Sequence, residues 1–127
     1  MQKGIFWLTL PDQNPQVPAK FHQLAKHFHV TLQFGVELTP EIQEMLGKTV
    51  EVMAVANCCN DKIQALRVSL PEEVRQLCNN ENPHMTISMV EGVKPVESNV
   101  MLEGDRMEVP MDLPLTLRFD FFQFGKI

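Results

Sequence analysis

Two short segments of the chain carry the same pair of side chains that can move protons. His29-Val30-Thr31 and His84-Met85-Thr86 each place a histidine two residues before a threonine. An imidazole with an ordinary pKa of about 6.5 can act as acid or base at neutral pH, and a threonine hydroxyl can donate to a phosphoryl oxygen. Together the two segments could hold a phosphate between two proton-transfer groups.

Both segments are predicted β-strands, and the strand period sorts their side chains onto two faces. In each, the histidine, the threonine and the next alternate residue, Gln33 or Ser88, share a polar face. The intervening residues, which end with Phe34 and Met89, form an apolar face. If the strands lie side by side, two imidazoles and two hydroxyls converge. The alternative is that threonine is simply a common strand residue and each histidine lies on the surface.

The composition is that of one globular domain spanning residues 1–127. Of the 127 residues 44% are hydrophobic and 21% are charged, which is ordinary for a folded protein. The net charge of −5 argues against binding long nucleic acid, which needs clustered positive charge. No apolar run suits a signal peptide or a membrane span, and the three cysteines form no C-x-x-C pattern. We therefore expect a cytoplasmic protein without disulfides or membrane contact, and the oligomeric state stays open.

Strand and helix signals follow an order that occurs twice along the chain. The first half, about residues 1–60, and the second half, about residues 61–127, each show strand, helix, motif strand, helix, strand. The predicted strands cover residues 5–10, 29–34, 49–56, 63–70, 84–89, 107–109 and 115–124, and the predicted helices cover 18–28, 39–47, 71–78 and 94–104. Pro110 and Pro114 suggest an edge or a connecting loop before the last strand. The repetition predicts an α+β fold with two similar lobes.

The doubled motif resembles the signature of the two-histidine (2H, LigT-like) phosphoesterase superfamily, which has one His-x-Thr/Ser motif in each half of a pseudo-symmetric fold. The resemblance implies two pseudo-symmetric lobes of antiparallel β-sheet, with helices on the outside and a central groove. The floor of that groove would carry His29, Thr31, His84 and Thr86. The chain and the spacing between its motifs are shorter than is usual for the family.

The activity implied by this resemblance is that of a metal-independent hydrolase. One histidine would take a proton from water or a ribose hydroxyl, the other would protonate the leaving oxygen, and the threonines would hold the nonbridging oxygens. The reaction would be a 2′,3′-cyclic phosphodiesterase or RNA-end-processing reaction, or hydrolysis of a cyclic nucleotide or oligonucleotide. The expected partner is a nucleotide or an RNA end. The alternatives are a non-catalytic nucleotide- or partner-binding module on the same fold, and an unrelated α+β interaction domain with fortuitous motifs.

Five further residues are candidates for substrate contacts. Arg67 and Ser69 share one face of a predicted strand and could assist with phosphate, although a solvated arginine is an equal alternative. Ser88 lies on the polar face of the second motif. Trp7 and Phe122 could stack a base, with core packing as the alternative.

The histidines and cysteines also offer candidate zinc ligands. His27 and His29 together with Cys58 or Cys78 could bind zinc in principle, but their spacing matches no known zinc finger. His22 is predicted to be solvated on the exposed side of a helix. We expect no metal site and no cofactor.

Overall fold

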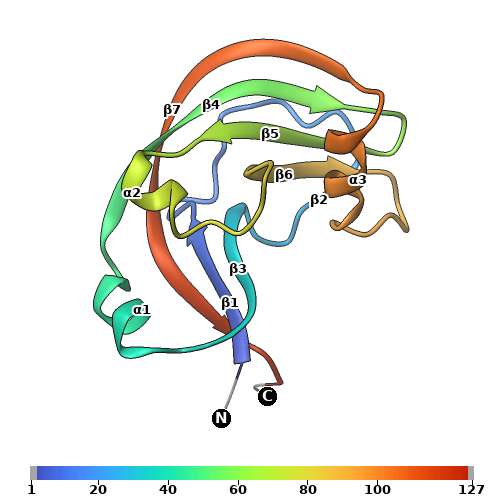
Figure 1. The fold of residues 1–127 in the computed structure, drawn as a ribbon. Helices are drawn as coiled ribbons and strands as arrows, with labels where there is room; N and C mark the ends of the chain where they lie inside the picture. Colours follow the sequence, from blue (N-terminus) through green and yellow to red (C-terminus); the bar gives the residue numbers. More distant parts are fainter. Residues whose placement is uncertain (1–2, 126–127) are drawn as a thin grey trace.

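Seven β-strands and three short helices make up the described part of the chain in the computed structural model, which covers residues 3–125 (Figure 1). The strands are β1 (Lys3–Thr9), β2 (Gln23–Leu24), β3 (His29–Glu37), β4 (Thr49–Cys59), β5 (Ile63–Ser69), β6 (His84–Met89) and β7 (Met107–Gln123). The helices are α1 (Pro40–Met45), α2 (Glu72–Arg75) and α3 (Glu97–Glu103). The predicted strands are confirmed, with the last two merged in β7, and so are three of the four predicted helices. Within residues 3–125 no helix is long and apolar enough to span a bilayer.

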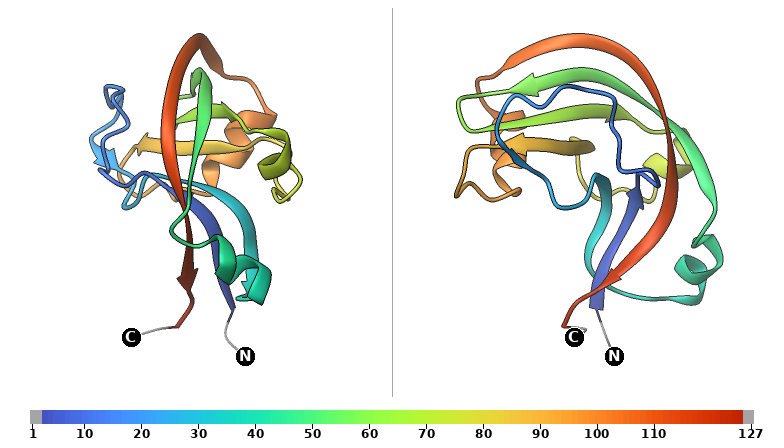
Figure 2. Two further views of the ribbon diagram at one scale, coloured as in Figure 1. Left: turned by 90° about the vertical axis from the view of Figure 1, so that its left-hand side faces the viewer. Right: turned by 180° about the vertical axis from the view of Figure 1, so that it is seen from behind.

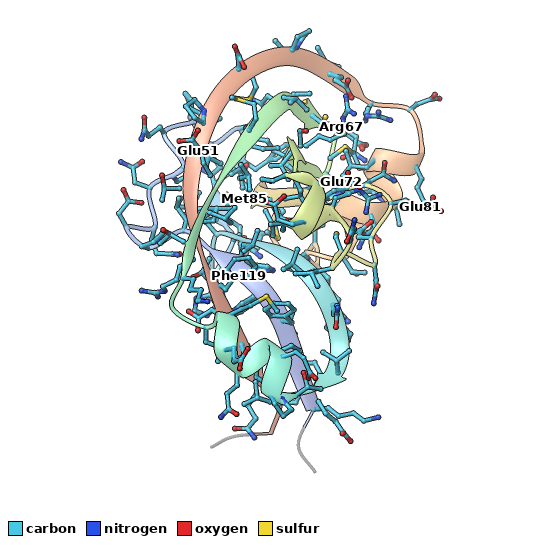
Figure 3. All side chains as sticks on the ribbon, turned by 60° about the vertical axis from the view of Figure 1, so that its left-hand side comes forward. Glu51, Arg67, Glu72, Glu81, Met85 and Phe119 are labelled. Atoms are coloured by element: carbon cyan, nitrogen blue, oxygen red, sulfur yellow. The ribbon has the colours of Figure 1, made fainter. Side chains whose placement is uncertain are left out.

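Six of the strands close into an antiparallel barrel. Their order is β6-β3-β1-β7-β4-β5, and pairing of β5 with β6 completes the ring. The long β4 and β7 arch over the other strands, as Figures 1 and 2 show. Alternate side chains fill the interior, among them Phe6, Leu8, Val30 and Met85. Met85 lies in the middle of the molecule in Figure 3.

The order and register of the strands repeat between the two halves of the chain. Exchanging β1 with β5, β3 with β6 and β4 with β7 leaves the order around the barrel unchanged. Trp7 pairs with Thr31 as Ala65 pairs with Thr86. In both ladders the register shifts between this residue of β1 or β5 and the residue before it. The predicted division into two pseudo-symmetric lobes is nevertheless not confirmed, because both halves contribute strands to one continuous barrel. The structure is mostly antiparallel β and fits the α+β class only broadly.

Residues 18–28 do not form the helix that their apolar spacing predicted. The only regular element there is β2, which pairs with the end of β6. Because β3 pairs with β6 at a single position, Val30 opposite Met85, the rest of β6 would otherwise offer a free edge. The segment covers this edge, and its Ala25 amide donates to the Ile87 carbonyl at 3.0 Å. Pairing across the edge satisfies backbone groups that a helix would satisfy internally.

The prolines of β7 lie where this strand has only one neighbour. Residues 107–117 pair with β4 alone, and pairing with β1 begins at Arg118. A proline lacks the amide hydrogen that a second neighbouring strand would need, so an edge tolerates it. Of the two alternatives for Pro110 and Pro114, the edge is confirmed and the connecting loop is not.

Candidate active site

Both motifs border one cavity of about 930 Å³. Its walls come from β1, β3 and β6, from the loop that precedes β6, and from the segment that includes α3. Val30 and Met85 point into the barrel core, so the residues beside them in the sequence point the other way. The cavity therefore lies on the outer side of the barrel wall, opposite the apolar core.

The pairing of Val30 with Met85 determines how the two motifs meet. In an antiparallel pair the flanking residues are matched crosswise, so His29 lies next to Thr86 and Thr31 lies next to His84. Each imidazole is thus beside the hydroxyl of the other motif, and all four side chains line the cavity. The structure brings together the four residues that the sequence singled out.

Both histidines are held by the carbonyl group two residues earlier in the chain. Nδ1 of His29 is 2.9 Å from the carbonyl oxygen of His27, and Nδ1 of His84 is 2.8 Å from that of Asn82. A carbonyl oxygen can only accept, so Nδ1 carries the proton in both rings. Nε2 is consequently the nitrogen of each ring that can exchange a proton with a substrate.

Burial lowers the pKa of both catalytic candidates below 6.5. Desolvation is the largest cause in each, and the hydrogen bond to the backbone carbonyl opposes it. Positive charge on His27 and on His84 lowers the pKa of His29 further. The environment thus favours the neutral imidazole, the form that can accept a proton from water.

The sequence of residues 13–111 matches the family described as the fungal tRNA ligase phosphodiesterase domain. This range covers most of the chain and contains both His-x-Thr motifs. The chain belongs to this family, whose members are 2H phosphoesterase domains. The resemblance to the 2H superfamily is thereby confirmed. A comparison with curated protein sequences gives no match.

Membership of the tRNA ligase phosphodiesterase family supports a cyclic phosphodiesterase-type function related to RNA processing. The matched range includes the motif strands β3 and β6 and the helix α3. It excludes β1 and all of the part of β7 that pairs with β1, so Trp7 and Phe122 lie outside it.

Ser98 is a further member of the site that belongs to neither motif. Its Oγ lies 2.9 Å from Nε2 of His84 and 3.1 Å from Oγ1 of Thr86, and its side chain is 1% exposed. The signal was present in the predicted helix, because Ser98 precedes the buried Met101 and Leu102 by three and four residues. A polar residue on the buried face of an amphipathic helix needs a partner, but the sequence could not say which one.

Phe34 also lines the cavity, although its position predicted the opposite face. Trp7 pairs with Thr31 and Phe6 with Gln33, so Leu32 is an extra residue in β3. Such a β-bulge inverts the alternation beyond it, which turns Phe34 away from the core and leaves it 71% exposed.

The same irregularity in β6 removes Ser88 from the site. Ala65 pairs with Thr86 and Gln64 with Ser88, so Ile87 is the extra residue. Ser88 therefore points away from the cavity face, is fully buried, and donates to Oε1 of Gln64 at 2.6 Å. The expectation that it shares the face of His84 is corrected.

Arg67 and Ser69 do not line the cavity either. Arg67 donates to Oε2 of Glu108 at 2.8 Å, and Ser69 is exposed at the end of β5. The expectation that they point into the groove is wrong, because a carboxylate from the distant strand β7 engages the guanidinium of Arg67. Figure 3 shows Arg67 beneath the arch of β7 and Glu81 on the loop before β6.

Trp7 and Phe122 form an aromatic cluster beside His29. Trp7 lines the cavity and its ring centroid lies 4.3 Å from that of His29. Phe122 packs against Trp7 with centroids 5.4 Å apart and is 45% exposed, but it does not line the cavity itself. Trp7 is therefore mostly covered, and Phe34 offers the more accessible ring in the cavity wall.

The candidate zinc ligands do not lie together. Cys58 contacts Glu108, while Sγ of Cys78 lies 3.8 Å from the Thr31 carbonyl oxygen. Across residues 3–125 no three histidine, cysteine or acidic side chains gather in a way that could hold a metal ion.

Proposed function

We propose that the chain is a metal-independent hydrolase that opens the cyclic phosphate of a small nucleotide or an RNA end. The observation that carries this proposal is the crosswise meeting of the two motifs in one cavity, with Nδ1 of both His29 and His84 tied to a backbone carbonyl. This arrangement presents two Nε2 atoms beside two hydroxyls. The family relationship supports the same reaction type.

In the proposed reaction a water oxygen forms a bond to phosphorus, and the bond from phosphorus to one ribose oxygen breaks. One of the two imidazoles, neutral at Nε2, takes a proton from the water, and the other, protonated at Nε2, gives a proton to the leaving ribose oxygen. Thr31 and Thr86 are placed to donate to nonbridging phosphate oxygens. The product is a ribose with one free hydroxyl and one phosphomonoester.

The charges of the cavity wall argue against a substrate with many negative charges. Among the described residues that line the cavity there is no lysine or arginine, and the acidic Glu81 and Glu103 are present. A cyclic phosphodiester carries one negative charge, which a single protonated histidine can balance. A polyanionic strand would require many more positive side chains than this wall supplies.

We propose that the base of the substrate stacks on the aromatic side of the cavity. Trp7 and Phe34 line that side, next to His29. Stacking on an aromatic ring contributes about 1–3 kcal/mol per base and tolerates any base identity. The phosphate would then reach the histidines while the base covers Phe34.

The experiment that tests this function is a hydrolysis panel in the presence of EDTA. The panel contains 2′,3′-cyclic mononucleotides, cyclic dinucleotides and RNA oligonucleotides that end in a 2′,3′-cyclic phosphate. We expect turnover by the wild type, and a loss of about 10²–10⁴-fold in both His29→Ala and His84→Ala. His22→Ala is the matched control, because His22 is exposed and does not line the cavity.

Two other outcomes would contradict the proposal. Turnover that survives in either motif variant would remove that histidine from the mechanism. Nucleotide binding by the wild type and all three variants without any turnover would instead show a binding module on the same fold.

A further inference from the structure

The two histidines of the site differ at the nitrogen that faces the substrate. Nε2 of His84 lies 2.9 Å from Oγ of Ser98. For Nε2 of His29 there is no hydrogen bond within residues 3–125, and its ring packs instead against Trp7. The two motifs therefore differ in this respect, because a residue of α3 hydrogen-bonds to the second motif and, among the described residues, none of α3 hydrogen-bonds to His29.

The contacts of Ser98 determine where its single proton goes. Oγ of Ser98 donates to the carbonyl oxygen of Pro95 at 2.7 Å, its shortest contact. A carbonyl oxygen cannot donate in return, so this bond uses the hydroxyl proton of Ser98. Oγ is then left with two lone pairs, which face Nε2 of His84 and Oγ1 of Thr86.

With its proton donated to Pro95, Ser98 is an acceptor toward His84. Nδ1 of His84 also faces an acceptor, the carbonyl oxygen of Asn82. In the site without substrate, every hydrogen bond in this group is satisfied when both nitrogens of His84 carry protons and Thr86 donates to Ser98. When a substrate phosphate binds, Thr86 turns its proton from Ser98 to a nonbridging oxygen. If His84 is neutral, Ser98 must either turn its proton to Nε2 and abandon Pro95, or leave Nε2 without a donor.

We propose that Ser98 is a positioning residue that stabilises the protonated form of His84 and holds its ring over the substrate cavity. Burial of His84 acts in the opposite direction. The neutral state is therefore not as strongly favoured at His84 as desolvation alone would make it. Ser98 thus gives the two motif histidines unequal proton affinities, which suits a reaction that uses one of them as acid and the other as base. This inference deepens the proposed function, but its test does not depend on turnover.

Other titratable or charged groups lie near His84 or face the same cavity. They are His29 on β3, Arg67 opposite His84 on β5 with its partner Glu108 on β7, Glu81 in the preceding loop and Glu103 on α3. A change of Ser98 to alanine removes one oxygen and leaves all of these charges in place. A change in the titration of His84 in this variant therefore reports on the hydroxyl.

The test is an NMR titration of the histidine rings in the wild type and in Ser98→Ala. We expect the midpoint of the His84 titration to fall by about half to one pH unit in S98A, while the midpoint of His29 stays within about 0.2 unit. Ser98→Thr keeps the hydroxyl and should restore the wild-type midpoint of His84. Ser69→Ala is the matched control, because Ser69 is an exposed serine that does not line the cavity.

The spectra also show whether each variant is folded, so a loss of structure is distinguished from a change in titration. An unchanged or raised midpoint of His84 in folded S98A would overturn the proposal. So would an equal shift of both histidines, which would indicate a general change of the site. If the hydrolysis panel yields a substrate, one limb of the pH dependence of kcat/KM should move to lower pH in S98A and the other should stay. The limb that moves then belongs to His84.

Discussion

At the scale of single residues, both motif histidines are held by the same local hydrogen bond. A backbone carbonyl two residues before each motif histidine accepts a hydrogen bond from Nδ1. Nε2 is then the nitrogen that remains for proton transfer in the cavity. The same hydrogen bond orients the ring, so the sequence spacing determines both the tautomer and the direction of Nε2. Burial then lowers the pKa of His29 and His84. The contact with Ser98 distinguishes the second histidine from the first.

The lowered pKa of these histidines predicts how stability depends on pH. The folded state disfavours their protonated forms, so between the folded pKa and 6.5 the unfolded chain binds more protons. The free energy of unfolding should therefore fall as the pH is lowered through 6.5. Urea denaturation at pH 7.5 and pH 5 measures this loss.

Glutamine variants identify the residues responsible for this loss. His29→Gln and His84→Gln should each show a smaller loss of stability between the two pH values than the wild type, because glutamine does not titrate. His22→Gln is the matched control at an exposed histidine and should behave as the wild type does. An undiminished loss in both motif variants would assign the pH dependence to other groups.

At the scale of elements, much of the fold could be predicted from local pattern. The strand period located β3 and β6, and a threonine cap followed by proline located α1. Residues 18–28 have apolar residues at helical spacing, but Gln23 and Leu24 pair with β6. Pairing with the free edge of this distant strand overrides the local preference for a helix. That edge exists only in the assembled barrel, so no local signal reports it.

The candidate site was predictable up to the point where each motif strand bulges. Thr31 and Thr86 precede the extra residues and lie where alternation places them. Phe34 and Ser88 follow the bulges and lie on the opposite faces from those predicted. A bulge is a property of the paired ladder, so a single strand sequence did not reveal it. Arg67 was misplaced for a related reason, since its partner Glu108 is remote in the sequence.

The pairing of β1 with β7 should depend on Gly4. A Cβ atom on Gly4 would collide with the carbonyl oxygen of Phe122 and would lie 2.9 Å from Cε2 of Phe121. Backbone cannot move aside easily, so Gly4→Ala should lower the free energy of unfolding by about 3 kcal/mol in chemical denaturation.

Gly104→Ala provides the matched control for this prediction. The nearest atom to a Cβ at Gly104 is 3.5 Å away, which is ordinary contact, so this variant should lie within about 1 kcal/mol of the wild type. Equal stability of the two variants would contradict this prediction, because it would show that β1 and β7 can move apart at Gly4 without lowering the free energy of unfolding.

At the scale of the whole molecule, the candidate site lies on the outer wall of the barrel and the hydrophobic core lies inside. One half of the cavity wall is aromatic, around Trp7 and Phe34, and the other half is covered by α3. The net charge is −5, and no lysine or arginine is among the described residues that line the cavity. These features suit recognition of one terminal nucleotide better than recognition of an extended strand.

Hydrolysis of an RNA end should consequently depend only weakly on salt. Proteins that make six to ten phosphate contacts lose roughly 10³–10⁵-fold in affinity between 50 and 200 mM salt. For a cyclic-phosphate-ended oligonucleotide we expect kcat/KM to change by less than about threefold over that range, since one or two phosphates are contacted. A 2′,3′-cyclic mononucleotide, measured in parallel, controls for effects on the reaction itself. A decrease of a hundredfold for the oligonucleotide alone would reveal an extended binding surface.

The measurement that tests the central claim most directly is the pH dependence of kcat/KM with EDTA present, for the wild type and each motif variant. Two histidines that act on one phosphodiester predict a bell-shaped profile for the wild type. His29→Ala and His84→Ala should each retain only one limb, and the lost limbs should differ between the two variants. A bell-shaped pH profile of kcat/KM that persists unchanged in either variant would contradict the two-histidine account. So would hydrolysis that is detected only after a divalent metal is added.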